Sequence, residues 1–217
     1  MRVLITGATG LIGSALSAFL KNEGHEVIGL TRREAKPDGS SISWNPAARS
    51  IDRDRLEGFG AVVHLAGENI ARRWTEDARR RIRESRVEGT RFLCETLAEL
   101  NQPPQVFIGA SAIGYYGNRG DEILTESSAP GQGFLADICR EWEAAADPAR
   151  RRGLRVVNAR LGIVLSPRGG ALGAMMIPFK LGLGGVIGSG RQYMSWIAID
   201  DAARALDHIL KTEGLEG

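Results

Sequence analysis

The chain has 217 residues, of which 43% are hydrophobic and 25% are charged, and its formal net charge is +2 at pH 7. Such a chain can bury a sizeable core as one domain, or as one domain with a partial lobe. The near-neutral charge gives no overall positive field for nucleic acid or a membrane surface, so we expect a small-molecule substrate and neither of those partners.

The first third of the chain alternates apolar runs with an amphipathic segment. Residues 2–6 (RVLIT) have the apolar, β-branched character of a strand buried on both faces. A helix is predicted next, with Gly24 placed where a left-handed C-terminal cap is expected. Further strands are predicted at 26–31, weakly at 42–44, and at 61–67, with mostly loop around the weak strand.

The same alternation continues along the chain. A helix from Thr75 to Leu100 is predicted, followed by a strand at 105–112, a helix from Phe134 to Ala146 and a strand at 154–165. Strands that alternate with helices predict an α/β fold with a doubly wound parallel sheet. We assign residues 1–165 and a returning helix at 200–213 to this domain, and the glycine-rich residues 166–199 to the start of a substrate-binding lobe.

Three glycines interrupt the run LITGATGLIG where the first strand becomes the first helix. Gly7, Gly10 and Gly13 would let a pyrophosphate approach the backbone, and the amides and dipole of the helix N-terminus would stabilise its charge. The alternative is a tight turn with close packing of the helix on the sheet. The position of the turn favours dinucleotide binding, with further contacts expected from Thr9, Leu11 and Ile12.

The end of the second strand indicates which dinucleotide is bound. An acidic residue there would accept hydrogen bonds from the adenosine ribose, but this sequence has Thr31, Arg32 and Arg33. Guanidinium groups suit a ribose 2′-phosphate, so NADP(H) is the expected cofactor. The alternative is that the two arginines belong to a solvated loop.

The motifs GATGLIG, HLAG (64–67) and SAIGYYG (111–117) occur in the order typical of the extended short-chain dehydrogenase/reductases, and the chain resembles that superfamily. The longer runs RRWTEDARRRIRESRVEGT, FKLGLGGVIGSGRQ and SWIAIDDAARAL resemble its atypical "epimerase family" branch, often labelled nucleoside-diphosphate-sugar epimerases. The resemblance implies a Rossmann-type sheet that binds NADP(H). It also implies cofactor contacts from Leu65, Ala66, Gly67, Arg86, Gly162 and Val164, whereas Arg79, Arg80 and Arg83 are interpreted as a solvated helix face.

The superfamily's usual Tyr-x-x-x-Lys pair is missing from GQGFLADICREWEAAA. Phe134 or Leu135 stands in the tyrosine region, and Ile138 or Cys139 stands in the lysine region. Ser111 ends a central strand, so Ser111, Tyr115 and Tyr116 are the catalytic candidates, with either phenol as the acid/base. The alternative is that the tyrosines only pack, and His64 is interpreted as a satisfied core histidine.

The sequence is compatible with three functions. The first is an NADP(H)-dependent oxidoreductase or epimerase acting on a small, for example nucleotide-linked, substrate. The second is a non-enzymatic NADP(H)-binding redox sensor, and the third, least favoured because aromatic residues do not interleave its arginine run, is a nucleic-acid-binding regulator. Cys94 and Cys139 show no metal spacing and suit reduced thiols in the cytoplasm, without a metal or a disulfide.

Two expectations concern the last part of the chain. Met175, Met176, Pro178 and Phe179 are interpreted as packing residues or as an adaptable apolar wall for substrate. The resemblance also predicts one further strand and a C-terminal segment after KTEGLEG, so the substrate lobe is expected to be incomplete in this sequence, and the sequence leaves the oligomeric state open.

Overall fold

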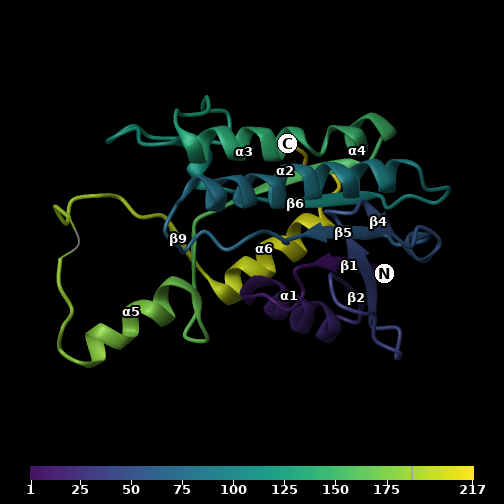
Figure 1. Cartoon of the computed structure of the whole chain (residues 1–217), viewed down its shortest axis with the longest axis horizontal. Coiled ribbons are helices and arrows are strands. Elements are labelled where there is room, and N and C mark those ends of the chain that lie inside the picture. The colour runs from purple at the N-terminus through teal and green to yellow at the C-terminus, as the bar shows by residue number, and fades with distance from the viewer. Residues whose placement is uncertain (187) are drawn as a thin grey trace.

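The computed structural model describes residues 1–186 and 188–217, and a seven-stranded sheet lies at its centre (Figure 1). The strand order is β4-β3-β2-β1-β5-β6-β7. The strands are β1 (Arg2–Thr6), β2 (Glu26–Thr31), β3 (Ser41–Asn45), β4 (Ser50–Ile51), β5 (Ala61–His64), β6 (Val106–Ala112) and β7 (Arg155–Leu161). All neighbours pair in parallel except β3 and β4, which are antiparallel. The predicted doubly wound, Rossmann-like sheet is therefore confirmed.

Helices cover both faces of the sheet. Helices α1 (Leu11–Asn22) and α6 (Ile199–Lys211) lie against one face, and α2 (Glu76–Ala98), α3 (Phe134–Ala144) and α4 (Asp147–Arg152) lie against the other (Figure 1). Successive residues of β1 serve opposite faces: Val3 and Ile5 pack in the α1/α6 cluster, and Leu4 packs in the α2/α4 cluster. This double burial explains the unbroken apolar runs in the central strands.

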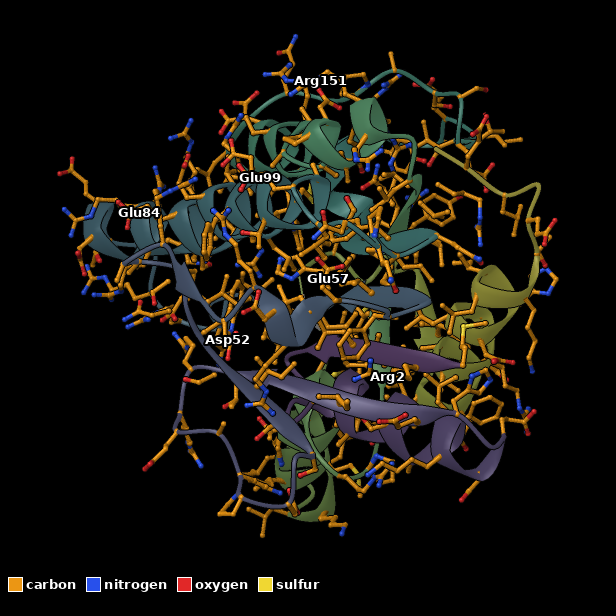
Figure 2. The ribbon with its side chains drawn as sticks, turned by 90° about the vertical axis from the view of Figure 1, so that its right-hand side faces the viewer. Arg2, Asp52, Glu57, Glu84, Glu99 and Arg151 are labelled. Atoms are coloured by element: carbon orange, nitrogen blue, oxygen red, sulfur yellow. The ribbon has the colours of Figure 1, made fainter. Side chains whose placement is uncertain are left out.

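The long helix α2 has the inward face that its sequence predicts. Ile82, Leu93 and Leu97 are buried, while Figure 2 shows Glu84 on the outer surface of the helix and Arg151 on that of α4. Gly24 follows α1 with φ of +80°, as the predicted left-handed cap requires. The polar, outward residues keep these helices at the surface of the domain.

The prediction of one continuous strand at 154–165 is wrong. This segment divides into β7 and β8 (Ile163–Leu165), and β8 leaves the main sheet to pair in parallel with β9 (Trp196–Ala198). Gly162 lies at the break, where a Cβ atom would lie 2.8 Å from the Ser195 carbonyl oxygen. Only glycine allows this close approach of two segments that are far apart in the sequence.

Two short elements that the sequence did not predict follow β3: the strand β4 and the 3-10 helix η1 (Asp54–Leu56). The glycine-rich segment contains α5 (Gly170–Lys180), which projects from the body of the molecule (Figure 1). None of its residues is buried, so the methionine cluster does not pack in the core. Large apolar side chains remain exposed along and beyond it at Ile177, Phe179, Leu181, Leu183 and Val186. In the part of the chain that the structure describes, no helix has the length and apolar character needed to span a bilayer.

Candidate functional site

The turn from β1 to α1 contains three glycines with different structural roles. Gly7 has φ of +67°, and a Cβ atom there would lie 3.0 Å from the backbone of Leu65. A Cβ atom on Gly13 would lie 2.2 Å from the Gly7 carbonyl oxygen, so α1 packs on the turn only if this residue is glycine. Gly10 is exposed, and its Cβ position meets only the Gly7 oxygen, at 3.2 Å. The fold therefore requires Gly7 and Gly13, whereas a Cβ atom on Gly10 would crowd one backbone oxygen only.

The N-terminus of α1 has the properties of an anion site. No side chain caps the helix, and its first turn contains no acidic residue. The Gly10 amide bonds back to the Gly7 oxygen at 2.9 Å, which holds the turn, while Thr9 is exposed and Leu11 and Ile12 are half-buried beside it. An uncapped helix N-terminus stabilises a phosphate group through its amides and dipole, so the residues present fit a dinucleotide pyrophosphate.

Two guanidinium groups follow β2 at the neighbouring strand end. Arg32 and Arg33 are exposed, and no carboxylate among the described residues forms an ion pair with either. The Arg33 amide donates to Thr31 Oγ1 at 3.2 Å, which orders the backbone where the strand ends. Both side chains are free to bind a phosphate group.

Thr6 connects the end of β1 to the loop after β5. Its Oγ1 accepts hydrogen bonds from the Leu65 and Ala66 amides, each at 3.0 Å, so its own proton is donated to His64 Nδ1 at 2.8 Å. This assigns the remaining His64 proton to Nε2, which is buried and has no partner among the described residues. Burial lowers the pKa of His64 to about 4. His64 is a core residue as predicted, but only one of its two nitrogens is satisfied.

Arg86, on α2, contacts the backbone of the loop that follows β5. Its Nη1 donates to the Glu68 carbonyl at 3.0 Å, its guanidinium lies over the Trp142 ring at 5.1 Å, and burial lowers its pKa. A Cβ atom on Gly67 would lie 3.2 Å from Arg86 Cζ. Arg86 therefore contacts the backbone of the loop that contains Leu65, Ala66 and Gly67.

The start of α5, which follows β8 in the chain, lies close to both the glycine turn and β8. A Cβ atom on Gly170 would lie 3.0 Å from Leu11 Cδ2 and 3.7 Å from the Val164 carbonyl oxygen. Gly162 and Val164 are half-buried. The fold thus brings Leu11 and the strand of Val164 to one region, although more than 150 residues separate them in the sequence.

A charged network links the ends of β6, β7 and α3. Arg160 on β7 donates Nε to Glu143 Oε1 at 2.9 Å and Nη2 to Glu143 Oε2 at 2.8 Å. The Ser111 hydroxyl donates to the same Glu143 Oε1 at 2.6 Å, and Arg160 Nη1 donates to the Tyr116 hydroxyl oxygen at 2.9 Å. The hydrogen bond to Glu143 raises the pKa of Arg160. Tyr115 contributes its ring, whose centroid lies 3.6 Å from Arg160 Cζ.

The structure brings the predicted residues Ser111, Tyr115 and Tyr116 together with Glu143 and Arg160, two residues that sequence reasoning did not single out. The Ser111 hydroxyl bonds to Glu143, and Arg160 contacts the Tyr116 phenol. An arginine within the apolar strand run at 154–165 was the available signal, because a partly buried guanidinium needs a carboxylate partner.

The structure also decides which α3 residues face Gly114, just after Ser111. The Cβ position of Gly114 lies 3.5 Å from Leu135 Cβ and 3.8 Å from Cys139 Sγ. Leu135 and Cys139 therefore face Gly114, while Phe134 faces Trp74 and Ile138 is buried. Burial raises the pKa of the Cys139 thiol, with a further contribution from Glu143.

The family model for the NAD dependent epimerase/dehydratase family matches residues 3–217. Epimerase family protein Mb2239 of Mycobacterium bovis is 44% identical over 216 residues, covering 99% of this chain and 71% of that protein. Human epimerase family protein SDR39U1 is 40% identical over 223 residues, covering 100% of this chain and 73% of that protein.

Two solved structures agree with the fold over the whole chain. The nucleoside-diphosphate sugar epimerase from Corynebacterium glutamicum superposes with a TM-score of 0.89 at 44% identity, and this chain spans 45% of that chain's length. Human SDR39U1 isoform 2, solved with NADPH, superposes with a TM-score of 0.88 at 38% identity, and this chain spans 72% of its length. The strand order, the glycine turn and these matches together show that the chain belongs to the NAD dependent epimerase/dehydratase family.

Proposed function

We propose that this chain binds NADP(H) at the carboxyl ends of β1, β2 and β5 and acts as an oxidoreductase or epimerase on a small, nucleotide-linked substrate. The observation that carries the proposal is the exposed Gly10 at an uncapped helix N-terminus, next to Arg32 and Arg33, which have no ion-pair partner in the described part of the chain. The human relative, which was solved with NADPH, supports the cofactor, and the similarity to the nucleoside-diphosphate sugar epimerase of Corynebacterium glutamicum supports the substrate class.

The remaining predicted cofactor residues have places in this proposal. Thr9, Leu11 and Ile12 border the pyrophosphate, Leu65, Ala66 and Gly67 line the crevice on the β5 side with Arg86 supporting them, and Gly162 and Val164 line the β7 side. Residues 1–165 and 200–213 form the cofactor-binding part, and 166–199 begin the substrate lobe. The two free, buried cysteines suit a reducing cytoplasm.

The proposed chemistry needs one acid/base beside the cofactor. A bound nicotinamide supplies or accepts a hydride, and a protein group moves the matching proton. Arg160 donates to the Tyr116 oxygen, so the phenol proton remains available for a substrate oxygen. Tyr115 is the second candidate, and Ser111 fixes Glu143 in the same network.

Cofactor preference tests the binding proposal. Calorimetric titration of NADPH and NADH should give a preference for NADPH, because each charge-assisted bond to the 2′-phosphate contributes roughly 1.5–3 kcal/mol. The Arg32→Ala/Arg33→Ala variant should lose that preference and retain NADH binding. Equal affinities in the parent protein, or an unchanged preference in the variant, would contradict the proposal.

Turnover tests the catalytic role. Once a substrate panel yields a cofactor-dependent absorbance change, Tyr116→Phe should reduce kcat by about 10²–10⁴ and leave NADPH affinity unchanged. Tyr115→Phe is the matched comparison on the neighbouring residue. Full activity in both variants would exclude the phenols as the acid/base.

A non-enzymatic NADP(H) sensor is the second candidate function. It is favoured by the absence of a Tyr-x-x-x-Lys pair from the sequence of α3, in which Leu135 and Cys139 face Gly114. A sensor should bind NADPH and NADP⁺ with different affinities while a broad substrate panel shows no turnover. Turnover that requires Tyr116 or Tyr115 would decide against it.

A further inference from the structure

An aromatic cluster with two arginines lies at the surface beside the proposed site. We call Arg73, Trp74, Arg79, Phe134 and Leu135 the Trp74–Phe134 cluster. The Trp74 and Phe134 rings lie 5.5 Å apart at 57°, and Arg79 Cζ lies 5.2 Å from the Phe134 centroid. Trp74 and Leu135 are each more than a third exposed, so part of this apolar surface is open to ligands.

The arginines of the cluster differ from their neighbours in lacking carboxylate partners. Arg72 pairs with Glu68, Arg80 and Arg81 pair with Asp77, and Arg83 pairs with Glu141. Among the described residues, neither Arg73 nor Arg79 forms an ion pair, although the sequence reading grouped Arg79 with Arg80 and Arg83 as a solvated face. Two guanidinium groups are therefore available to an external anion.

The loop that presents the cluster is held by its own hydrogen bonds. Trp74 Nε1 donates to the Ile70 carbonyl at 2.9 Å, so the indole offers its ring and not its N–H to a ligand. Arg72 bonds to Glu68 Oε1 at 2.6 Å, and the Glu68 amide bonds to Ser85 Oγ at 3.0 Å. A surface ordered before binding loses little conformational entropy when a ligand arrives.

The cluster adjoins the site. Leu135 contacts Gly114, three residues after Ser111, and Arg86 lies two helical turns after Arg79 on α2, where it supports Gly67. Both α2 and α3 begin on the side of the molecule from which α5 projects (Figure 1). A ligand on the cluster would therefore reach the carboxyl ends of β5 and β6.

We propose that the Trp74–Phe134 cluster is a subsite for the nucleoside diphosphate part of the substrate. The partly exposed Trp74 ring provides a stacking surface for a base, and Arg73 and Arg79 provide two positive charges for the diphosphate. An arginine stacked on an aromatic ring keeps its N–H edge free for phosphate oxygens. The inference rests on the proposed function, because it places the nucleotide of that substrate.

The test uses the protein both saturated with NADPH and free of cofactor. UDP is the probe, and uridine and inorganic pyrophosphate are partial probes. UDP should bind at least tenfold more tightly than either partial probe. Arg79→Gln should weaken UDP binding by roughly 10- to 100-fold, since it removes a charge-assisted contact. Arg80→Gln is the matched control, because Arg80 is the next residue on the same helix and Asp77 keeps Arg81 as a partner.

The contribution of the Trp74 ring can be tested separately from that of the arginines. Trp74→Leu should weaken UDP and leave pyrophosphate binding unchanged. Absence of UDP binding, or equal losses in Arg79→Gln and Arg80→Gln, would overturn the inference. NADPH titration of both arginine variants should match the parent protein. Failure to bind NADPH would contradict the proposed function alone, since the UDP comparison is also made without the cofactor.

Discussion

Gly10 and Gly13 lie in one turn, but their environments predict opposite outcomes on substitution. Gly10→Val should abolish NADPH binding, because the side chain enters the space beside the helix N-terminus while its Cβ meets only the Gly7 oxygen, at 3.2 Å. Gly13→Ala should instead lower the free energy of unfolding by roughly 1–3 kcal/mol, because its Cβ would lie 2.2 Å from that oxygen. Urea unfolding and cofactor titration separate the two. An unfolded Gly10→Val protein, or one with undiminished affinity, would show that Gly10 serves only the turn.

His64 makes the stability of the protein depend on pH. Its folded pKa is about 4, against 6.5 in a model peptide, so between these values the unfolded chain binds more protons than the folded one. The free energy of unfolding should therefore fall as pH falls from about 6.5 towards 4, with a total loss of about 3 kcal/mol from this residue. Urea unfolding from pH 7.5 to 4.5 measures the slope.

The control for this pH dependence is His64→Asn, which keeps an acceptor for the Thr6 hydroxyl and cannot gain a proton in this range. Its stability should change less between pH 7.5 and 5 than that of the parent protein, whatever its absolute value. Equal slopes would show that His64 does not contribute.

At the level of elements, the Arg160–Glu143 ion pair joins β7 to α3, and the Ser111 hydroxyl connects β6 to the same carboxylate. The Arg160 and Glu143 side chains are 20% and 12% exposed, so removing one leaves the other charged and largely desolvated. Glu143→Gln and Arg160→Met should each destabilise the fold by about 3 kcal/mol, and the double variant should cost less than the sum of the two. A double-mutant cycle by chemical unfolding measures the coupling. Additive losses would indicate that the pair does not act as a unit.

The same elements explain which parts of the sheet were predictable. Strands β1, β2, β5 and β6 are buried on both faces, so each is a short, continuous apolar run in the sequence. The separation of β8 from β7 was not predictable, because the main sheet and the β8–β9 pair both require apolar, β-branched residues. The chain leaves the main sheet at Gly162 because Ser195 approaches it there, and this contact between distant residues is not encoded in any local sequence pattern.

At the level of the whole molecule, the cofactor-binding sheet and the α5 segment differ in packing. The sheet is covered on both faces, whereas α5 has no buried residue and leaves large apolar side chains exposed. The predicted apolar wall for substrate stays a prediction, since Met175 and Met176 are only half-buried in the described structure. The position of α5 beside Leu11 is compatible with a lobe over the glycine turn.

The sequence alone determined the fold class and the place of the glycine turn, because both depend on residues close together in the chain: periodic apolar runs, and glycines between a strand and a helix. It also indicated NADP(H), because Arg32 and Arg33 directly follow β2. Only the tertiary structure decided which of the three glycines leaves space for a ligand, and that Leu135 and Cys139 face Gly114. It alone joined Glu143 to Arg160 and Trp74 to Phe134, because these contacts connect residues 17 and 60 positions apart, whose distances depend on how the helices pack on the sheet.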